Sequence, residues 1–201
     1  SRILLDKNDE SQSFPQMISF LEMYHVGKIE QLNIQKRWNE NNPVNSLETP
    51  IGVDEQGELF KLDLHEQIHG PHGLVAGMTG SGKSEFIMTY ILSLAINYHP
   101  NEVAFILIDY KGGGMAKSFE KLPHTAGIIT NLDGQAIKRS LTSIESELRR
   151  RQEIFVNASK ELSVSNIDIY KYQRLYRERK VTEPLQHLFI ISDEFAELKA
   201  Q

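Results

Sequence analysis

The sequence contains no cysteine and no long apolar segment. Without cysteine, the chain can be neither a disulfide-stabilised scaffold nor a cysteine-ligated zinc finger. No apolar run approaches the roughly 18 residues of a membrane-spanning helix, and the polar start of the chain does not resemble a signal peptide. The content of 40% hydrophobic and 24% charged residues is that of a globular protein. A chain of 201 residues can bury a core without a disulfide or a metal.

Charge is unevenly distributed along the chain. The net charge is -5, but residues 138–180 hold 11 basic and 6 acidic residues, which leaves -10 on the remainder. The basic segment has few interleaved aromatic residues, so we favour solvated helix faces, or a surface for an acidic neighbour, over a nucleic-acid patch.

The first 48 residues are predicted to form a helical appendage and linker. Ser13 is placed to cap a helix that stops at Gly27, and the polar residues 38–43 suggest a loop, with Trp38 as an anchor on the main domain. From residue 49 to residue 64, two strand-like runs flank a hairpin turn at residues 54–57. We place the main domain at residues 49–201.

Downstream of residue 70, apolar strand patterns alternate with helical ones, which predicts an α/β fold with a mostly parallel sheet flanked by helices. A glycine-rich loop is expected at residues 112–114, where the strand that ends at Asp109 has finished. Asp133 is expected to cap a long amphipathic helix. The expected strands are residues 73–76, 103–108, 127–130 and 188–191, and the main expected helices are residues 84–98, one after residue 133, and 167–179.

Residues 77–84 match the phosphate-loop pattern G-x-x-x-x-G-K-[ST] at every fixed position. Glycines let backbone N–H groups turn toward phosphates, and the helix that follows adds its positive end. Lys83 is predicted to reach the outer phosphates and Ser84 to bind Mg²⁺. The predicted nucleotide-binding residues of the loop are Gly77, Met78, Thr79, Gly80, Ser81, Gly82, Lys83 and Ser84.

Asp193 and Glu194 follow the last apolar strand and complete the predicted site. A carboxylate at the end of a buried strand can hold the metal of a phosphate-loop site, which is the role we predict for Asp193. An adjacent glutamate can polarise the attacking water, so we predict Glu194 as the catalytic base beside the catalytic Lys83.

Residues 65–69 match the zinc protease pattern H-E-x-x-H. That pattern requires a helix, but the glycine and proline at positions 70 and 71 would break one immediately. We therefore interpret these residues as polar groups that lead into the first strand.

Several motifs together resemble the FtsK/SpoIIIE family of phosphate-loop motor ATPases. The resemblance runs from about residue 50 to residue 201, and its most characteristic stretches are residues 70–85, 107–113, 122–124, 147–151 and 191–198. It extends the nucleotide-binding segment to Glu85. Tyr110 and the glycines after it look most like the secretion ATPases of type VII systems, the EssC/EccC group, because DNA translocases of the family usually carry proline there.

The resemblance implies a RecA-like ATPase domain that uses ATP and Mg²⁺, the first of several in a membrane-anchored motor on the cytoplasmic face of a bacterial membrane. It also implies export of small helical WXG-type proteins, together with neighbouring ATPase domains or subunits. In that core a further strand follows the metal carboxylate, so we expect the C-terminal part of the core to be missing here and the isolated chain to be weakly active or inactive. The alternatives are a DNA-translocating motor and a regulatory ATP-binding module without turnover.

Overall fold

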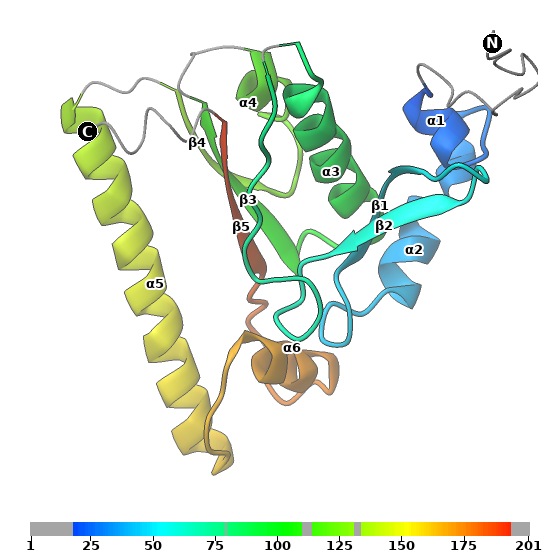
Figure 1. The fold of residues 1–201 in the computed structure, drawn as a ribbon. Coiled ribbons are helices and arrows are strands. Elements are labelled where there is room, and N and C mark those ends of the chain that lie inside the picture. The colour runs from blue at the N-terminus through cyan, green and yellow to red at the C-terminus, as the bar shows by residue number, and fades with distance from the viewer. Residues whose placement is uncertain (1–17, 79, 110–113, 131–133, 194–201) are drawn as a thin grey trace, which may run out of the picture.

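The computed structural model describes residues 18–78, 80–109, 114–130 and 134–193 (Figure 1). Its centre is a parallel sheet with the strand order β4-β3-β5, built from β3 (Val103–Asp109), β4 (Thr125–Ile129) and β5 (His187–Asp193). β3 is the central strand because its residues are apolar and almost all buried, as parallel strands covered on both faces are. The expected α/β fold with a parallel sheet is confirmed.

Helices lie on both sides of this sheet (Figure 1). On one side are α3 (Lys83–Asn97) and the short α4 (Gly114–Ser118), and on the other is the long α5 (Gly134–Leu162). α6 (Ile169–Arg177) lies at the end where β3 and β5 begin, and Asp168 caps it. The helices of residues 84–98 and 167–179 are therefore confirmed. α4 was not predicted, and Asp133 and most of the expected glycine loop lie outside the described residues.

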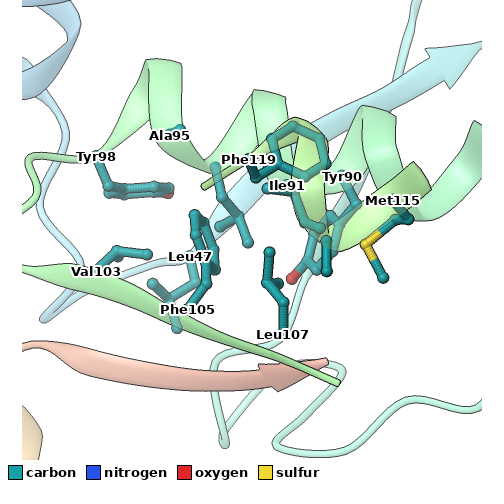
Figure 2. Packing of buried hydrophobic residues seen from close by; sticks show 12 residues of the cluster. Leu47, Tyr90, Ile91, Ala95, Tyr98, Val103, Phe105, Leu107, Met115 and Phe119 are labelled. Atoms are coloured by element: carbon teal, nitrogen blue, oxygen red, sulfur yellow. The ribbon is translucent and has the colours of Figure 1, made fainter. Parts of the chain in front are cut away.

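The main core lies between α3 and the sheet (Figure 2). α3 is apolar on nearly all sides, and its second half is buried from Tyr90 to Asn97. Phe105 and Leu107 of β3 are fully buried against it. This packing fixes the second half of α3 against the sheet, while Ser84 and Glu85 in its first turn are exposed.

The N-terminal region comprises α1 (Phe20–Met23), the 3-10 helix η1 (Ile29–Leu32) and α2 (Ile34–Glu40). The helix predicted between Ser13 and Gly27 is confirmed only at Phe20–Met23 within the described residues, because Ser19 has an extended backbone and caps α1 with a capping box. The predicted loop at residues 38–43 is wrong at its first three residues, which form the last turn of α2. Polar contacts with α3, from Arg37 to Asn97 and from Trp38 to Ala95, accompany this helical turn.

Trp38 anchors α2 on the main domain, as expected. Its indole N–H donates a hydrogen bond of 2.9 Å to the carbonyl oxygen of Ala95 in α3. Its ring also lies edge-on to His99 and His124. The appendage is thus packed against the same helix that follows the phosphate loop.

A separate antiparallel hairpin consists of β1 (Glu48–Val53) and β2 (Leu59–Asp63), which confirms the predicted hairpin. Asp54 closes its turn by accepting hydrogen bonds from the backbone N–H groups of Gln56 and Glu58. β1 packs against α3, and Ile51 and Leu62 of the hairpin contact the core that lies between α3 and the sheet.

Residues 71–78, which we call the stem, lead from the hairpin to the phosphate loop. The predicted strand at residues 73–76 is wrong, because the structure gives this segment no strand assignment and leaves all its residues exposed, Leu74 by 80%. An isolated strand leaves its backbone groups unpaired. Within the described residues β5 pairs only with β3, and Ile190 in β5 is 47% exposed. Among the described residues, no strand is paired with the apolar stem.

α5 is amphipathic along its length, as predicted. Its second half packs on α6 and the segment before β5 through Ala158, Tyr172 and Leu185. Glu147 and Arg151 form an ion pair with an N–O distance of 2.8 Å, and Arg150 also binds Glu147. Among the described residues, no helix has the length and apolar character needed to cross a membrane.

Candidate nucleotide-binding site

The phosphate loop has a backbone that only glycine adopts readily. Gly80 and Gly82 have φ angles of +79° and +90°, in the left-handed region. A Cβ atom on Gly77 would lie 2.4 Å from the Oγ atom of Ser81. The loop therefore closes on itself at Gly77 and turns into α3 at Gly82, with its concave side free of side chains at these three positions.

Lys83 lies across the loop that it follows. Its Nζ atom donates hydrogen bonds to the carbonyl oxygens of Gly77, at 2.6 Å, and Met78, at 2.9 Å. The ammonium group is thus held at the mouth of the loop, next to the first backbone N–H groups of α3. A positive side chain and a helix amino end beside a glycine-lined cradle fit the phosphate groups of a nucleotide.

Ser84 and Glu85 are exposed on the first turn of α3, while Thr79 lies outside the described residues. The amino end of α3 and the carboxyl ends of β3 and β5 lie at the same end of the sheet (Figure 1). The amino end of α3, which follows the phosphate loop, therefore lies at the same end of the sheet as Asp193.

Asp193 is the last residue of β5 and lies in register with Asp109, the last residue of β3. Asp109 is buried, so two carboxylates end adjacent strands. Hydroxyl and carboxylate oxygens are ligands that Mg²⁺ prefers, so Ser84 and Asp193 are donors of the right chemical type for that ion. Sequence reasoning gave Asp109 no role in the site, although its position after an apolar strand is the same signal that identified Asp193. Glu194 lies outside the described residues.

Residues 65–69 form a turn and not a helix, so their histidines do not line one helix face. His65 is buried, and its Nε2 atom lies 3.2 Å from the carbonyl oxygen of Val44. His69 is exposed and accepts a hydrogen bond from the backbone N–H of Asp63. No group of three or more potential metal ligands occurs in the part of the chain that the structure describes.

Comparison with known proteins decides the family. The sequence model of the FtsK/SpoIIIE family matches residues 32–200 of this chain. The chain belongs to the FtsK/SpoIIIE family. The stem, the phosphate loop and Asp193 all lie within the matched region.

Two curated relatives within the family are bacterial secretion proteins. The type VII secretion system protein EssC of Staphylococcus aureus strain Mu50 is 55% identical over 189 residues, which make up 94% of this chain and 12% of EssC. The ESX secretion system protein YukB of Bacillus subtilis strain 168 is 49% identical over 193 residues, or 95% of this chain and 12% of YukB. The chain therefore spans about an eighth of the length of these FtsK/SpoIIIE relatives.

A solved structure of this family has the same fold. The cytoplasmic domain of the Thermomonospora curvata type VII secretion ATPase EccC matches with a TM-score of 0.71 and 31% identity, over 92% of this chain and 22% of that chain. A second structure, of ATPases 2 and 3 of the same EccC in complex with a signal sequence peptide, matches with a TM-score of 0.60 and 26% identity, over 77% of this chain and 27% of that chain.

The loop geometry predicts the effect of Gly77→Ala. The added methyl group would displace Ser81 and distort the cradle, because it would lie 2.4 Å from the Ser81 Oγ atom. We expect a loss of ATP affinity of about tenfold, which corresponds to about 1.4 kcal/mol. Isothermal titration calorimetry measures it. Gly52→Ala is the matched control, since a Cβ atom there meets nothing within 4 Å; equal affinities of the two variants would contradict the prediction.

Proposed function

We propose that this chain is the nucleotide-binding part of an ATPase domain that hydrolyses ATP to drive type VII protein secretion. The observation that carries the proposal is the cradle formed by Gly77, Gly82 and Lys83 at the amino end of α3, in a chain 55% identical to EssC. Family membership supports ATPase activity in general. The proposal extends that activity to this domain.

Each site residue has a defined task in the proposed reaction. Lys83 would leave the carbonyl oxygens of Gly77 and Met78 and donate to the outer phosphates, which are stronger acceptors. Ser84 and Asp193 would hold Mg²⁺, which when bound offsets the negative charge of the phosphates. Glu194 would accept a proton from the attacking water. Glu85 would line the site next to Ser84.

The proposed setting is a multi-domain motor at the cytoplasmic face of a bacterial membrane, anchored through segments outside these residues. The length of the curated relatives, of which this chain matches 12%, supports neighbouring ATPase domains or subunits as partners. The EccC complex with a signal sequence peptide supports secreted proteins as substrates. We propose that these are small helical proteins of the WXG type.

We also propose that residues 49–201 form an ATPase core that is completed by a further strand between β5 and the stem. The exposure of Leu74 in the stem and of Ile190 in β5 supports this proposal. Among the described residues, the stem is not paired with any strand and β5 is paired along one edge only, with β3. Residues 1–48 would be the appendage that docks on α3 through Trp38.

The first test is binding of ATP with Mg²⁺ to the 201-residue chain. We expect saturable binding that Lys83→Ala weakens about 10- to 100-fold, because hydrogen bonds from a charged group contribute about 1.5–3 kcal/mol. Fluorescence titration with a labelled ATP analogue measures the affinity. Lys117→Ala, which removes an exposed lysine of α4, is the control and should bind as the parent does. Absence of saturable binding to the parent chain would refute the proposed function.

A further inference from the structure

A compact turn formed by residues 63–70 directly precedes the stem. The carboxylate of Asp63 accepts hydrogen bonds from the backbone N–H groups of Leu47, at 3.0 Å, and His65, at 2.9 Å. A Cβ atom on Gly70 would lie 2.2 Å from the carbonyl oxygen of Leu64, so the turn closes tightly at that glycine. These contacts fix the conformation of the turn, and with it the position at which the exposed stem begins.

Tyr170 of α6 contacts this turn through both its ring and its hydroxyl group. Its ring centroid lies 4.2 Å from that of His65, and its hydroxyl oxygen accepts a hydrogen bond of 3.1 Å from the backbone N–H of Glu66. The ring also lies 4.6 Å from the ring of His187, the first residue of β5. One tyrosine thus contacts both the turn before the phosphate loop and the strand that ends at Asp193.

α6 itself is fixed to the strands that it contacts. The side-chain amide of Gln173 donates to the carbonyl oxygens of Glu102, at 2.8 Å, and Leu185, at 3.0 Å. The guanidinium of Arg177 forms two bonds, of 2.5 Å and 2.8 Å, with the buried carboxylate of Glu102. Tyr170 therefore projects from a helix that cannot shift relative to β3 and β5 without breaking buried polar contacts.

The stem has few other attachments. Its residues are all exposed and form no strand, and at its far end Lys83 binds the carbonyl oxygens of Gly77 and Met78. The position of its near end relative to β5 is set by the turn at residues 63–70, which Tyr170 joins to α6 and to His187.

We infer that Tyr170 is a positioning residue that aligns the phosphate loop with Asp193, the two halves of the proposed Mg-ATP site. This inference rests on the proposed function. The loop binds the phosphates and Asp193 reaches them only through Mg²⁺, so a relative displacement of the two halves reduces the contribution of Mg²⁺ to binding. Binding of Mg-free nucleotide depends on the phosphate loop alone, so a displacement of the loop relative to Asp193 should leave it unchanged.

The test compares nucleotide affinity with Mg²⁺ and with EDTA in the 201-residue chain. We expect Tyr170→Ala to lower the affinity for Mg-ATP about fivefold, which is the low end of typical coupling between two sites. In EDTA, the affinity for ATP should change less than about twofold. Tyr170→Phe keeps the ring that contacts His65 and His187 and should retain most of the Mg²⁺ effect. Tyr170→Leu replaces Tyr170→Ala if the latter fails to fold.

Tyr172→Ala on the same helix is the matched control. Its hydroxyl donates to the carbonyl oxygen of Glu183 and its ring packs on Phe155, so it stabilises α6 without touching the turn at residues 63–70. It should lower the thermal midpoint but leave the Mg²⁺ effect unchanged. Equal Mg²⁺ effects in the parent, Tyr170→Ala and Tyr172→Ala would overturn the inference, whereas failure of the parent to bind ATP would overturn the proposed function.

Discussion

Glu194→Gln should bind Mg-ATP as tightly as the parent and hydrolyse it about 10²- to 10⁴-fold more slowly, the usual contribution of a general base. Glutamine keeps the size and polarity of glutamate but cannot accept a proton from water. The phosphate contacts that we propose for Lys83 and the Mg²⁺ contact that we propose for Asp193 do not involve Glu194, so the loss should appear in turnover and not in affinity. The same variant separates a hydrolase from a regulatory module that only binds ATP.

The measurement uses the full-length secretion ATPase that we propose contains this domain, because a trans-acting arginine can contribute about 10³ to 10⁵ in rate. Phosphate release is followed under saturating ATP, and binding is followed separately with a labelled analogue. Glu197→Gln, three residues further along the chain, controls for the loss of one negative charge. A Glu194→Gln protein that turns over ATP at the parental rate would show that Glu194 is not the base.

Acidification below pH 6.5 should destabilise the fold through His187. His187 is 8% exposed, and within the described residues neither nitrogen atom of its ring has a hydrogen-bond partner. Burial, with smaller contributions from the nearby His65 and Arg151, lowers the pKa of His187 to about 3. The imidazole is therefore neutral in the folded state, and the unfolded chain takes up its proton near pH 6.5.

Because the pKa of His187 is lower in the folded state, its contribution to stability is complete above pH 6.5 and is lost as the pH falls toward 3. The slope is about 1.4 kcal/mol per pH unit, so about 2 kcal/mol is lost between pH 6.5 and pH 5. Tyr170, whose ring is tilted by 57° against that of His187 and whose pKa is raised by burial, stays protonated throughout this range.

Urea denaturation at several pH values between 5 and 7.5 measures this slope. His187→Phe should flatten it by about 1.4 kcal/mol per pH unit and should not destabilise the protein at pH 7.5, since it removes two buried atoms without hydrogen bonds. His72→Phe, which removes an exposed histidine of the stem, is the control and should keep the parental slope. An unchanged slope in His187→Phe would contradict the assignment to this ring.

Local sequence patterns predicted most of the helices and strands because burial of an apolar stretch, or a helix cap, dominates the conformation of each. β3, β5, α3 and α6 each have a continuous apolar stretch or a clear cap, and the structure places them where the sequence does. The stem has the same apolar pattern, but it is not paired with any strand in the part of the chain that the structure describes, so the pattern alone predicted a strand that is not formed. A β-strand forms only where a second strand is available for pairing, and the local sequence carries no information about that second strand.

By itself, the sequence determined the chemistry of the candidate site, because a phosphate cradle needs glycines, a lysine and a hydroxyl at fixed spacing in residues 77–84. Only the tertiary structure decided what surrounds that site: Asp109 beside Asp193, Trp38 on α3, and Tyr170 between His65 and His187. Phosphate binding is a local property of one turn and the helix after it. Alignment depends on contacts between residues up to 105 positions apart, as Tyr170 and His65 are, and chain folding alone brings these together.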